Sequence, residues 1–570
     1  MQECLHSHQK CNPLLSKAEW WPNRLLDVGD SSEDANVKLI ITADSRPSGN
    51  YMTLSHCWGT AQFANLSISN IDELRSGIGL KTLPKTFREA ISVARLFKVS
   101  YLWIDSLCII QDSLEDWNAE ASLMSEVYQH ALCNIAATGA GNSNGGLFFS
   151  RDPRTLQPCK VQLVPEETNN DHLPIRHAYV MDSEDWKNRV DMAPLMKRAW
   201  VVQERLLAKR VLHFGKDQLL WECQEKAASE VFPRKVPNVP WPWQSNTKFK
   251  DIIPKAFHGF IRAVQDNTEQ NIQDEALIWG RILRSYSRGQ LTKARDKEVA
   301  LIGIIRALEK NFNDSTVVGL WKKGMPFQLL WQAQHPSKRS TIYRAPSWSW
   351  LSMDGEIRSH VPSAPEHPET FIRVPAIQIE DIKIIRDGSS LLSPIKGGYI
   401  RVKGRLKPGT WSDLRGTSWP PLCFNGLDAV QGQGLLSSWL DDTSRGKFPS
   451  ENIWCLPVEE IYENGKYYSD GLVLKLASRL EGNCICYERV GTYYASGEQN
   501  RRLFEKESRS PQQQSKEAEQ EKHASQTSRE GTDRPSSGKA DSPQASNDSS
   551  QVENALEGQG GLVEESIIII

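Results

Sequence analysis

The sequence lacks long apolar runs and a strong net charge. No stretch reaches the roughly 18 apolar residues that a membrane-spanning helix needs, and the apolar Ile567–Ile570 is far too short. No basic segment followed by an apolar one opens the chain, so we expect no secretory leader. The 68 Lys and Arg nearly balance the 70 Asp and Glu, and a formal net charge of −2 exerts little long-range attraction on nucleic acid or anionic lipid. We therefore expect neither a nucleic-acid partner nor a membrane span.

The chain also lacks a dense cysteine framework. Its eleven cysteines are scattered over 570 residues, whereas a secreted disulfide scaffold is shorter, denser and usually has an even number. This pattern is typical of a reducing compartment, so we expect a cytoplasmic protein.

Tryptophan is the residue type in excess, with 19 copies. Each large ring buries on the order of 150–250 Å², so this number indicates well-packed apolar interiors. A chain of this length exceeds one compact core. We expect four parts: a lead-in over 1–45, an α/β domain over 46–215, an accessory domain over 216–495 and a disordered tail over 496–570.

The α/β prediction comes from alternating strand and helix patterns. Strand patterns occupy Tyr51–His56, Tyr101–Ile104 and Cys133–Ala137, and helical spacing of apolar residues occupies Leu83–Lys98 and Asp116–His130. Strands separated by helices at this spacing predict a parallel sheet covered by helices.

Beyond residue 215 the patterns change. Helical spacing over Phe257–Tyr286 and Lys297–Phe312 is followed by β-like runs from about residue 371, which predicts a helix-plus-β domain. The pair Trp348 and Trp350 is interpreted as core packing there. From Gly497 onward Gln, Ser, Glu and Lys dominate, and such a composition buries too little apolar surface to order the chain.

Several blocks, read in order, resemble one known family. They are YMTLSHCWG at Tyr51–Gly59, LPKTFREAISVARLF at Leu83–Phe97, YLWIDSLCIIQD at Tyr101–Asp112, GLFFSRDP at Gly146–Pro153 and RAWVVQERLLAKRVLHF at Arg198–Phe214. Together they resemble the fungal heterokaryon incompatibility (HET) domain. The lead-in with Cys4, His8 and Cys11, and the blocks Arg295–Ile304 and Arg344–Gly355, also resemble HET-domain proteins.

The resemblance implies a doubly wound parallel sheet, distantly similar to TIR domains (TIR- or flavodoxin-like), and a role in non-self recognition leading to regulated cell death. It implies protein partners engaged through HET-domain association. A divergent family member without an incompatibility role is the alternative.

The resemblance to TIR domains also raises an enzymatic hypothesis. TIR-type enzymes that cleave NAD carry an essential glutamate on a helix after a sheet strand, and here Glu120 follows Trp117 at such a place. A carboxylate there could hold the ribose hydroxyls of NAD or stabilise an oxocarbenium-like transition state. Glu120, with Asp105, is the catalytic candidate and NAD the possible substrate, and no cofactor is assigned. The alternative is an ordinary first-turn glutamate.

Ligands of doubly wound sheets bind at the carboxyl ends of the strands. The residues expected at this edge are Ser55, His56, Cys57, Trp58, Asp105, Cys108, Gln111 and Asp112. The alternative reading is structural: Asp105 caps a turn, and the cysteines are small packing residues.

Two further sites are considered and set aside. Cys108 with His56 or His130 suggests a thiol nucleophile, but no base lies at a diagnostic spacing. Cys4, His6, His8 and Cys11 suggest zinc, but their spacing is unusual for a closed site and no second ligand pair follows. The sequence therefore predicts no metal site. The Glu204–Arg205 pair is interpreted as orienting a neighbouring segment.

Overall fold

The structure is a computed structural model. The residues that it describes are 1–12, 20–29, 36–60, 65–163, 176–180, 182, 184–237, 269–361, 371–389, 393–411, 422–423, 437–443, 453–481, 484–497 and 564–570. None of the helices in these stretches is both long and apolar enough to cross a membrane.

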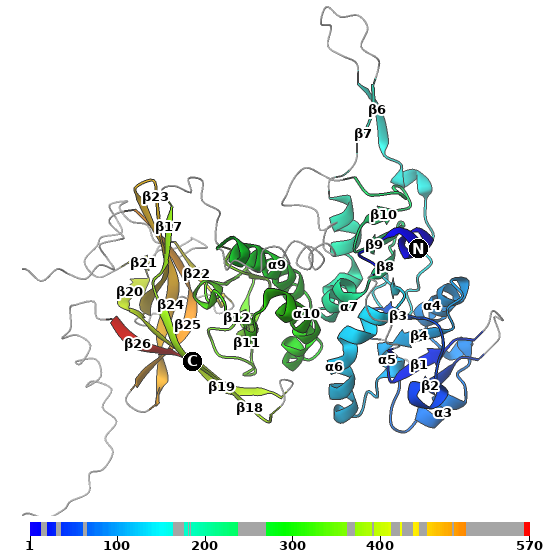
Figure 1. Cartoon of the computed structure of the whole chain (residues 1–570), viewed down its shortest axis with the longest axis horizontal. Helices are drawn as coiled ribbons and strands as arrows, with labels where there is room; N and C mark the ends of the chain where they lie inside the picture. The colour runs from blue at the N-terminus through cyan, green and yellow to red at the C-terminus, as the bar shows by residue number, and fades with distance from the viewer. Residues whose placement is uncertain are drawn as a thin grey trace, which may run out of the picture. The chain divides into compact units, whose positions relative to one another are not determined.

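The chain divides into two compact units (Figure 1). Unit 1 comprises Met1–Ser363, Ile384–Gly398 and Asp441–Arg445, and unit 2 comprises Ala364–Lys383, Tyr399–Leu440 and Gly446–Ile570. The limits expected at residues 45 and 215 both fall inside unit 1. The helical part of the expected accessory domain therefore belongs with the α/β region, and its β-rich part forms most of the second unit.

Unit 1 is built on an eight-stranded sheet in the order β10-β9-β8-β5-β3-β4-β1-β2. Its strands are β1 (Arg24–Asp27), β2 (Lys38–Ile41), β3 (Tyr51–Ser55), β4 (Tyr101–Ile104), β5 (Asn134–Ala136), β8 (Arg210–Phe214), β9 (Leu219–Cys223) and β10 (Ala227–Ser229). The central strands β4, β3, β5 and β8 are parallel, and both edges are antiparallel. The α/β class is confirmed, but the sheet is mixed, because β1 and β2 come from the lead-in and β9 and β10 follow residue 215.

The elements of the central region lie close to their expected positions. The helices are α4 (Lys85–Leu96), α6 (Leu114–His130) and α7 (Trp200–Leu207). Helix α4 buries Phe87, Ala90, Ile91 and Ala94, the one-sided spacing of a helix that packs on a sheet. Helix α6 begins with Ser113, whose hydroxyl accepts a hydrogen bond from the Asp116 amide, a favourable N-cap.

Shorter elements complete unit 1. They are α1 (Gln2–Ser7), α2 (Thr42–Ser45), α3 (Ile71–Ser76), α5 (Asp105–Cys108), η1 (Leu80–Thr82), η2 (Pro153–Leu156), η3 (Lys187–Asp191), η4 (Pro194–Lys197), η6 (Ala294–Lys297), η7 (Val299–Leu301), η8 (Trp350–Ser352), α11 (Met325–Gln328), the hairpin β6 (Cys159–Leu163) and β7 (Arg176–Val180), and the two-residue strands β11 to β16 between Thr316 and Arg358.

Two later helices, α9 (Glu269–Ser287) and α10 (Ile302–Phe312), pack into unit 1, and α10 contacts both α6 and α7. The expected helix over 257–286 is present from Glu269, and its earlier part lies outside the described residues. Gly303 allows the close packing of α10, because a Cβ there would lie 2.8 Å from both Ser125 Cβ and Gln203 Oε1. Trp348 and Trp350 are fully buried.

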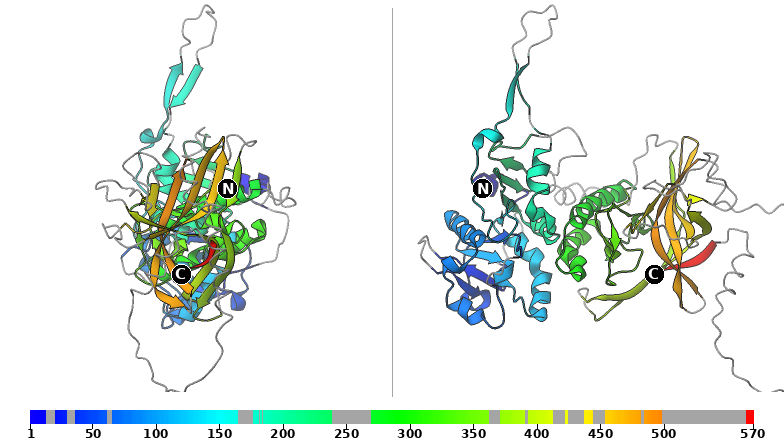
Figure 2. Two further views of the ribbon diagram at one scale, coloured as in Figure 1. Left: turned by 90° about the vertical axis from the view of Figure 1, so that its left-hand side faces the viewer. Right: turned by 180° about the vertical axis from the view of Figure 1, so that it is seen from behind.

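Unit 2 contributes most of a ten-stranded sheet in the order β18-β19-β26-β25-β24-β23-β20-β21, with β17 paired to β23 and β22 to β25. The strands are β17 (Ile372–Pro375), β18 (Gln378–Arg386), β19 (Ile395–Arg405), β20 (Lys407–Trp411), β21 (Leu422–Cys423), β22 (Ser437–Leu440), β23 (Ile453–Glu463), β24 (Lys466–Glu481), β25 (Cys484–Ser496) and β26 (Glu564–Ile569). Figure 2 shows the long antiparallel strands β23, β24 and β25 side by side. The expected β-rich region is confirmed.

Strand β26 corrects the expectation of a disordered tail at its far end. Glu564–Ile569 pairs antiparallel with β19 and parallel with β25. Its apolar run buries Ile567, Ile568 and Ile569, and this burial of apolar surface favours an ordered strand at the end of the chain. The remainder of the expected tail, residues 498–563, lies outside the described residues.

Candidate functional site

The parallel pairing of β3 and β4 brings the expected strand-end residues together. Ser55 ends β3 and His56 follows it, and Asp105 directly follows β4 at the same edge of the sheet. His56 and Ser55 are buried, while the Asp105 side chain is 16% exposed. The sheet therefore gathers Ser55, His56 and Asp105 as the sequence predicts, into what we call the strand-end cluster.

Asp105 is the hub of this cluster. Its Oδ2 accepts a 3.0 Å hydrogen bond from Trp58 Nε1 and lies 3.6 Å from Arg198 Nη2. Its Oδ1 lies 3.8 Å from His56 Nδ1 and accepts a hydrogen bond from the Ser106 amide. Arg198 also donates to the backbone carbonyl of His56. Asp105 thus caps its own turn, as the structural reading expected, and also links β3 to the segment before α7.

Burial sets the protonation of the groups around this hub. The pKa of His56 is lowered to about 4, mainly by burial and also by Arg198, although Asp105 opposes the shift. Burial raises the pKa of the Cys57 thiol and raises that of Cys108 to about 12. At neutral pH the imidazole is uncharged and both cysteines are thiols, so the site holds no activated thiolate.

Glu204 of α7 adds a second carboxyl behind the cluster. It is 2% exposed and lies close to the side chains of Ser55 and Tyr128. Burial raises its pKa, while Arg198 opposes that shift. Sequence reasoning missed Arg198 and assigned Glu204 only an orienting role. The one available signal was a run of charged residues, Glu204 and Arg205, within an otherwise apolar helix.

Arg205 faces away from the strand-end cluster. Its Nε and Nη2 donate to the two carboxylate oxygens of Glu222 on β9 at 2.6 and 2.9 Å, and its Nη1 donates to Asp191 at 2.8 Å. His213 Nε2 lies 3.2 Å from the same Glu222. The adjacent Glu204 and Arg205 therefore hold different parts of the fold.

Gln111, Asp112 and Cys108 have structural contacts beside the cluster. Gln111 Nε2 donates hydrogen bonds to the carbonyls of Asp105 and Ile109. Asp112 Oδ1 accepts a hydrogen bond of 2.9 Å from the Ile68 amide. Cys108 is fully buried, and its carbonyl accepts from Arg24 Nε. These contacts shape the turn after β4.

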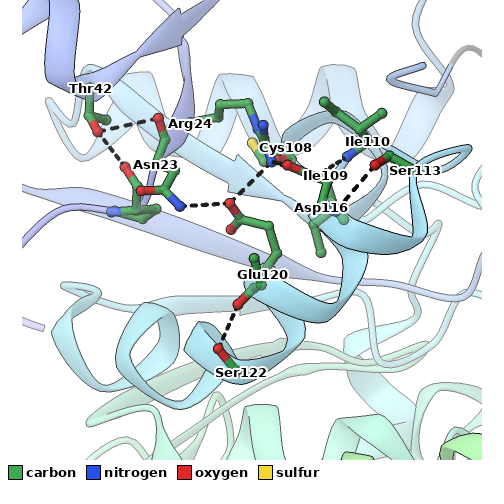
Figure 3. A network of polar contacts seen from close by, with 12 residues as sticks. Asn23, Arg24, Thr42, Cys108, Ile109, Ile110, Ser113, Asp116, Glu120 and Ser122 are labelled. Carbon is green, nitrogen blue, oxygen red and sulfur yellow. Dashed lines mark hydrogen bonds and ion pairs between the residues drawn. The ribbon is translucent and has the colours of Figure 1, made fainter. Parts of the chain in front are cut away.

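Glu120, the other catalytic candidate, lies in a separate buried network (Figure 3). Its Oε1 accepts hydrogen bonds from Asn23 Nδ2 at 2.9 Å and Arg24 Nη2 at 3.1 Å. The same Arg24 nitrogen contacts both oxygens of Asp116 at 2.6 and 2.7 Å. Burial raises the pKa of Glu120, while Asn23 and Arg24 lower it. The carboxylate faces cationic and amide donors from the lead-in.

One cavity of about 340 Å³ opens beside α6. Trp117 and Asn118 of α6 form one wall, and Arg295, Lys297 and Arg344 contribute basic groups to the others. The pKa of Lys297 is lowered to about 7, mainly by burial and also by the nearby Arg344. Neither Glu120 nor Asp105 lines this cavity.

The strand-end cluster lies within a region that matches a family model. Residues 51–204, from the first residue of β3 to Glu204, match the model of the heterokaryon incompatibility protein family, HET. The chain carries a HET domain. The domain match contains every member of the strand-end cluster, whereas Asn23 and Arg24 of the Glu120 network lie before it.

A curated relative supports the same assignment. The chain is 31% identical over 118 residues to heterokaryon incompatibility protein 6, OR allele, of Neurospora crassa. That similarity covers 19% of this chain and spans only 17% of the relative's length. No solved structure matches the chain.

Proposed function

We propose that this chain is a fungal HET-domain protein that signals in non-self recognition, in the process of vegetative incompatibility, and promotes regulated cell death. The observation that carries the proposal is the HET-domain match over residues 51–204, supported by the similarity to an incompatibility protein. The divergent family member without an incompatibility role stays the rival.

The strand-end cluster favours signalling over catalysis. Asp105 is engaged by Trp58 and Arg198, Glu204 is buried, and both neighbouring thiols are protonated at neutral pH. Such a site links β3, β4 and α7 through charge, and it offers no activated nucleophile. In the proposed mechanism, partner-driven association of HET domains transmits the signal.

The strand order supports a doubly wound, TIR-like relationship as part of this proposal. Counted along the chain, the parallel strands β3, β4, β5 and β8 lie in the order 2-1-3-4. Flavodoxin-like doubly wound sheets share this order, and they bind ligands where it reverses. In this chain that point lies between β3 and β5, beside Ser55.

NAD hydrolysis through Glu120 is the enzymatic alternative. This reaction would require a carboxylate that contacts the substrate. Glu120 is instead 2% exposed, and its Oε1 already accepts hydrogen bonds from Asn23 and Arg24. We therefore assign Glu120 a structural role in the proposed mechanism. A cytoplasmic location completes the proposal, supported by the absence of a disulfide among the cysteines whose side chains are described.

Inducible expression of the full chain in a filamentous fungus tests the proposal, with cell viability and cellular NAD measured together. We expect cell death without a preceding fall in NAD. Arg198→Gln, which removes the guanidinium from the strand-end cluster, should reduce killing at equal protein level. Arg154→Gln is the matched control, because Arg154 pairs only with the neighbouring Asp152 on the surface and should leave killing intact.

The alternatives give different outcomes in the same experiment. Survival of cells that express the folded chain, alone and beside an incompatible partner strain, would favour the divergent family member. A fall in NAD that Glu120→Gln abolishes, but Glu115→Gln on the exposed side of α6 does not, would establish the hydrolase instead.

A further inference from the structure

Four metal-ligand side chains converge where the N-terminal segment meets the sheet. Cys4 lies on α1, His8 and Cys11 follow it, and Cys223 ends β9. One ligand atom from each lies within 4.8 Å of the others, and all four residues are buried. His8 Nδ1 is 3.3 Å from Cys223 Sγ and 3.9 Å from Cys11 Sγ. We call these residues the Cys3His cluster.

The dimensions of the cluster suit a tetrahedral zinc ion. Zinc bonds sulfur at about 2.3 Å and imidazole nitrogen at about 2.0–2.1 Å, which places neighbouring ligand atoms roughly 3.5–3.8 Å apart. The two distances from His8 Nδ1 to the sulfurs of Cys223 and Cys11 bracket this range. All three cysteines are free of disulfides, so their sulfurs are available to a metal.

The backbone that carries three of the ligands is held in place by one side chain. Asn12 Nδ2 lies 2.7 Å from the Cys4 carbonyl, 3.1 Å from that of Leu5 and 2.9 Å from that of His8. These contacts fold residues 4–12 back on themselves and direct Cys4, His8 and Cys11 to one point. A preorganised ligand loop of this kind lowers the ordering cost of metal binding.

Arg210 supplies a charge partner for the cluster. Its Nε lies 3.2 Å from Cys4 Sγ, and its Nη2 donates to the Cys11 carbonyl at 3.3 Å. Arg210 is the β8 partner of Cys223 in the sheet register. Three thiolates, a neutral imidazole and a divalent zinc carry a net charge of −1, which the buried guanidinium neutralises, as outer-shell groups at metal sites do.

We propose that Cys4, His8, Cys11 and Cys223 bind a structural zinc ion that fastens the N-terminal segment to the edge of the sheet. Four protein ligands close the coordination shell and leave no position for water or substrate, so the ion stabilises the fold and does no chemistry. All four ligands lie outside residues 51–204, so the HET-domain match does not assign this site. The fourth ligand, Cys223, lies more than 200 residues beyond Cys11, so the local spacing of Cys4, His8 and Cys11 gives no sign of it.

Metal analysis of the purified full-length protein tests this proposal, with no chelator or affinity-column metal used in preparation. We expect about one zinc per chain, released in step with thiol modification by a mercurial reagent. Cobalt substituted for the zinc should give the absorption of a tetrahedral thiolate site. These measurements on the unaltered chain do not depend on any variant folding.

A matched pair of variants locates the ion. Cys223→Ser should lower zinc content at least about tenfold, whereas Cys133→Ser, at another buried cysteine on the sheet, should keep it. Less than about 0.1 zinc per unaltered chain, with no tetrahedral cobalt spectrum, would overturn the proposal. So would a disulfide between Cys4 and Cys11 in the protein isolated under reducing conditions, or zinc retained in full by Cys223→Ser.

Discussion

Arg24 on β1 lies between two carboxylates of α6, with its Nη2 2.6 Å from Asp116 Oδ2 and 3.1 Å from Glu120 Oε1. The side chains of Arg24 and Glu120 are only 10% and 2% exposed, so water screens this pair weakly. A strand that precedes the HET-domain match thus holds a helix inside it. Strand β1 and the helix that it contacts therefore both belong to unit 1.

Replacing Arg24 by methionine should destabilise unit 1 by about 3–5 kcal/mol, because it leaves buried carboxylates without their cation. Adding Glu120→Gln to that variant should recover part of the loss, since it removes one uncompensated charge. Arg75→Met is the control, because the Arg75–Asp44 pair is exposed and should contribute less than about 1 kcal/mol. Urea unfolding measures all four proteins. Equal losses for Arg24→Met and Arg75→Met would contradict the structural role.

His56 should make the stability of unit 1 sensitive to mild acid. Its folded-state pKa of about 4 lies below the ordinary value of 6.5, and the charged groups facing it are Asp105 and Arg198. As pH falls, the His56 imidazole therefore binds a proton in the unfolded chain before it does so in the folded one. The contribution of His56 to the free energy of unfolding is complete above pH 6.5 and is lost progressively towards pH 4. The full loss is about 3 kcal/mol for this group.

Thermal unfolding between pH 7.5 and 4.5 checks this prediction. Acidic groups add their own pH dependence, so the quantity compared is the difference between the unaltered chain and His56→Gln. The variant should lose less stability across this window, whereas His6→Gln, at an exposed position, should follow the unaltered chain. Parallel curves for His56→Gln and the unaltered chain would mean that the imidazole is not neutral in the fold.

Two helical glycines should respond to alanine in opposite directions. A Cβ on Gly303 would meet Ser125 and Gln203 at 2.8 Å, so Gly303→Ala should force α10 away from α6 and α7 and cost about 1–3 kcal/mol. On α9, Gly280 has no neighbour closer than 3.4 Å, so Gly280→Ala should be neutral or stabilise by up to about 1 kcal/mol. Calorimetry distinguishes the two variants. Stabilisation by Gly303→Ala would show that α10 packs less closely.

Strand β26 should be essential to the sheet of unit 2, because it lies between β19 and β25. Ile568→Lys places a charge at a position that is 3% exposed and should separate the strand from its neighbours. Ser566→Lys is the control, because Ser566 is exposed and its hydroxyl contacts Glu380. Hydrogen exchange should show lost protection in β19 for the first variant only. If hydrogen exchange in β19 were unchanged in Ile568→Lys, β26 would not be part of the folded sheet.

Local patterns in the sequence determined much of the central fold. The run Tyr101–Ile104 is apolar throughout, and it forms the buried strand β4 with the expected limits. The spacing of Phe87, Ala90 and Ile91 specified the buried face of α4. Strand period, helical period and the family blocks all act over a few residues, so one sequence suffices to recognise them. The HET assignment rested on the same short-range information.

Tertiary structure decided which side chains meet. Arg198 lies beside Asp105, and Arg24 contacts Glu120. Cys223 lies beside Cys4 although more than 200 residues separate them in the sequence. Such contacts depend on strand order and on edge strands that come from both sides of the HET-domain match. Periodicity carries no information about strand order, because it records which face of an element is apolar and not which neighbour covers it.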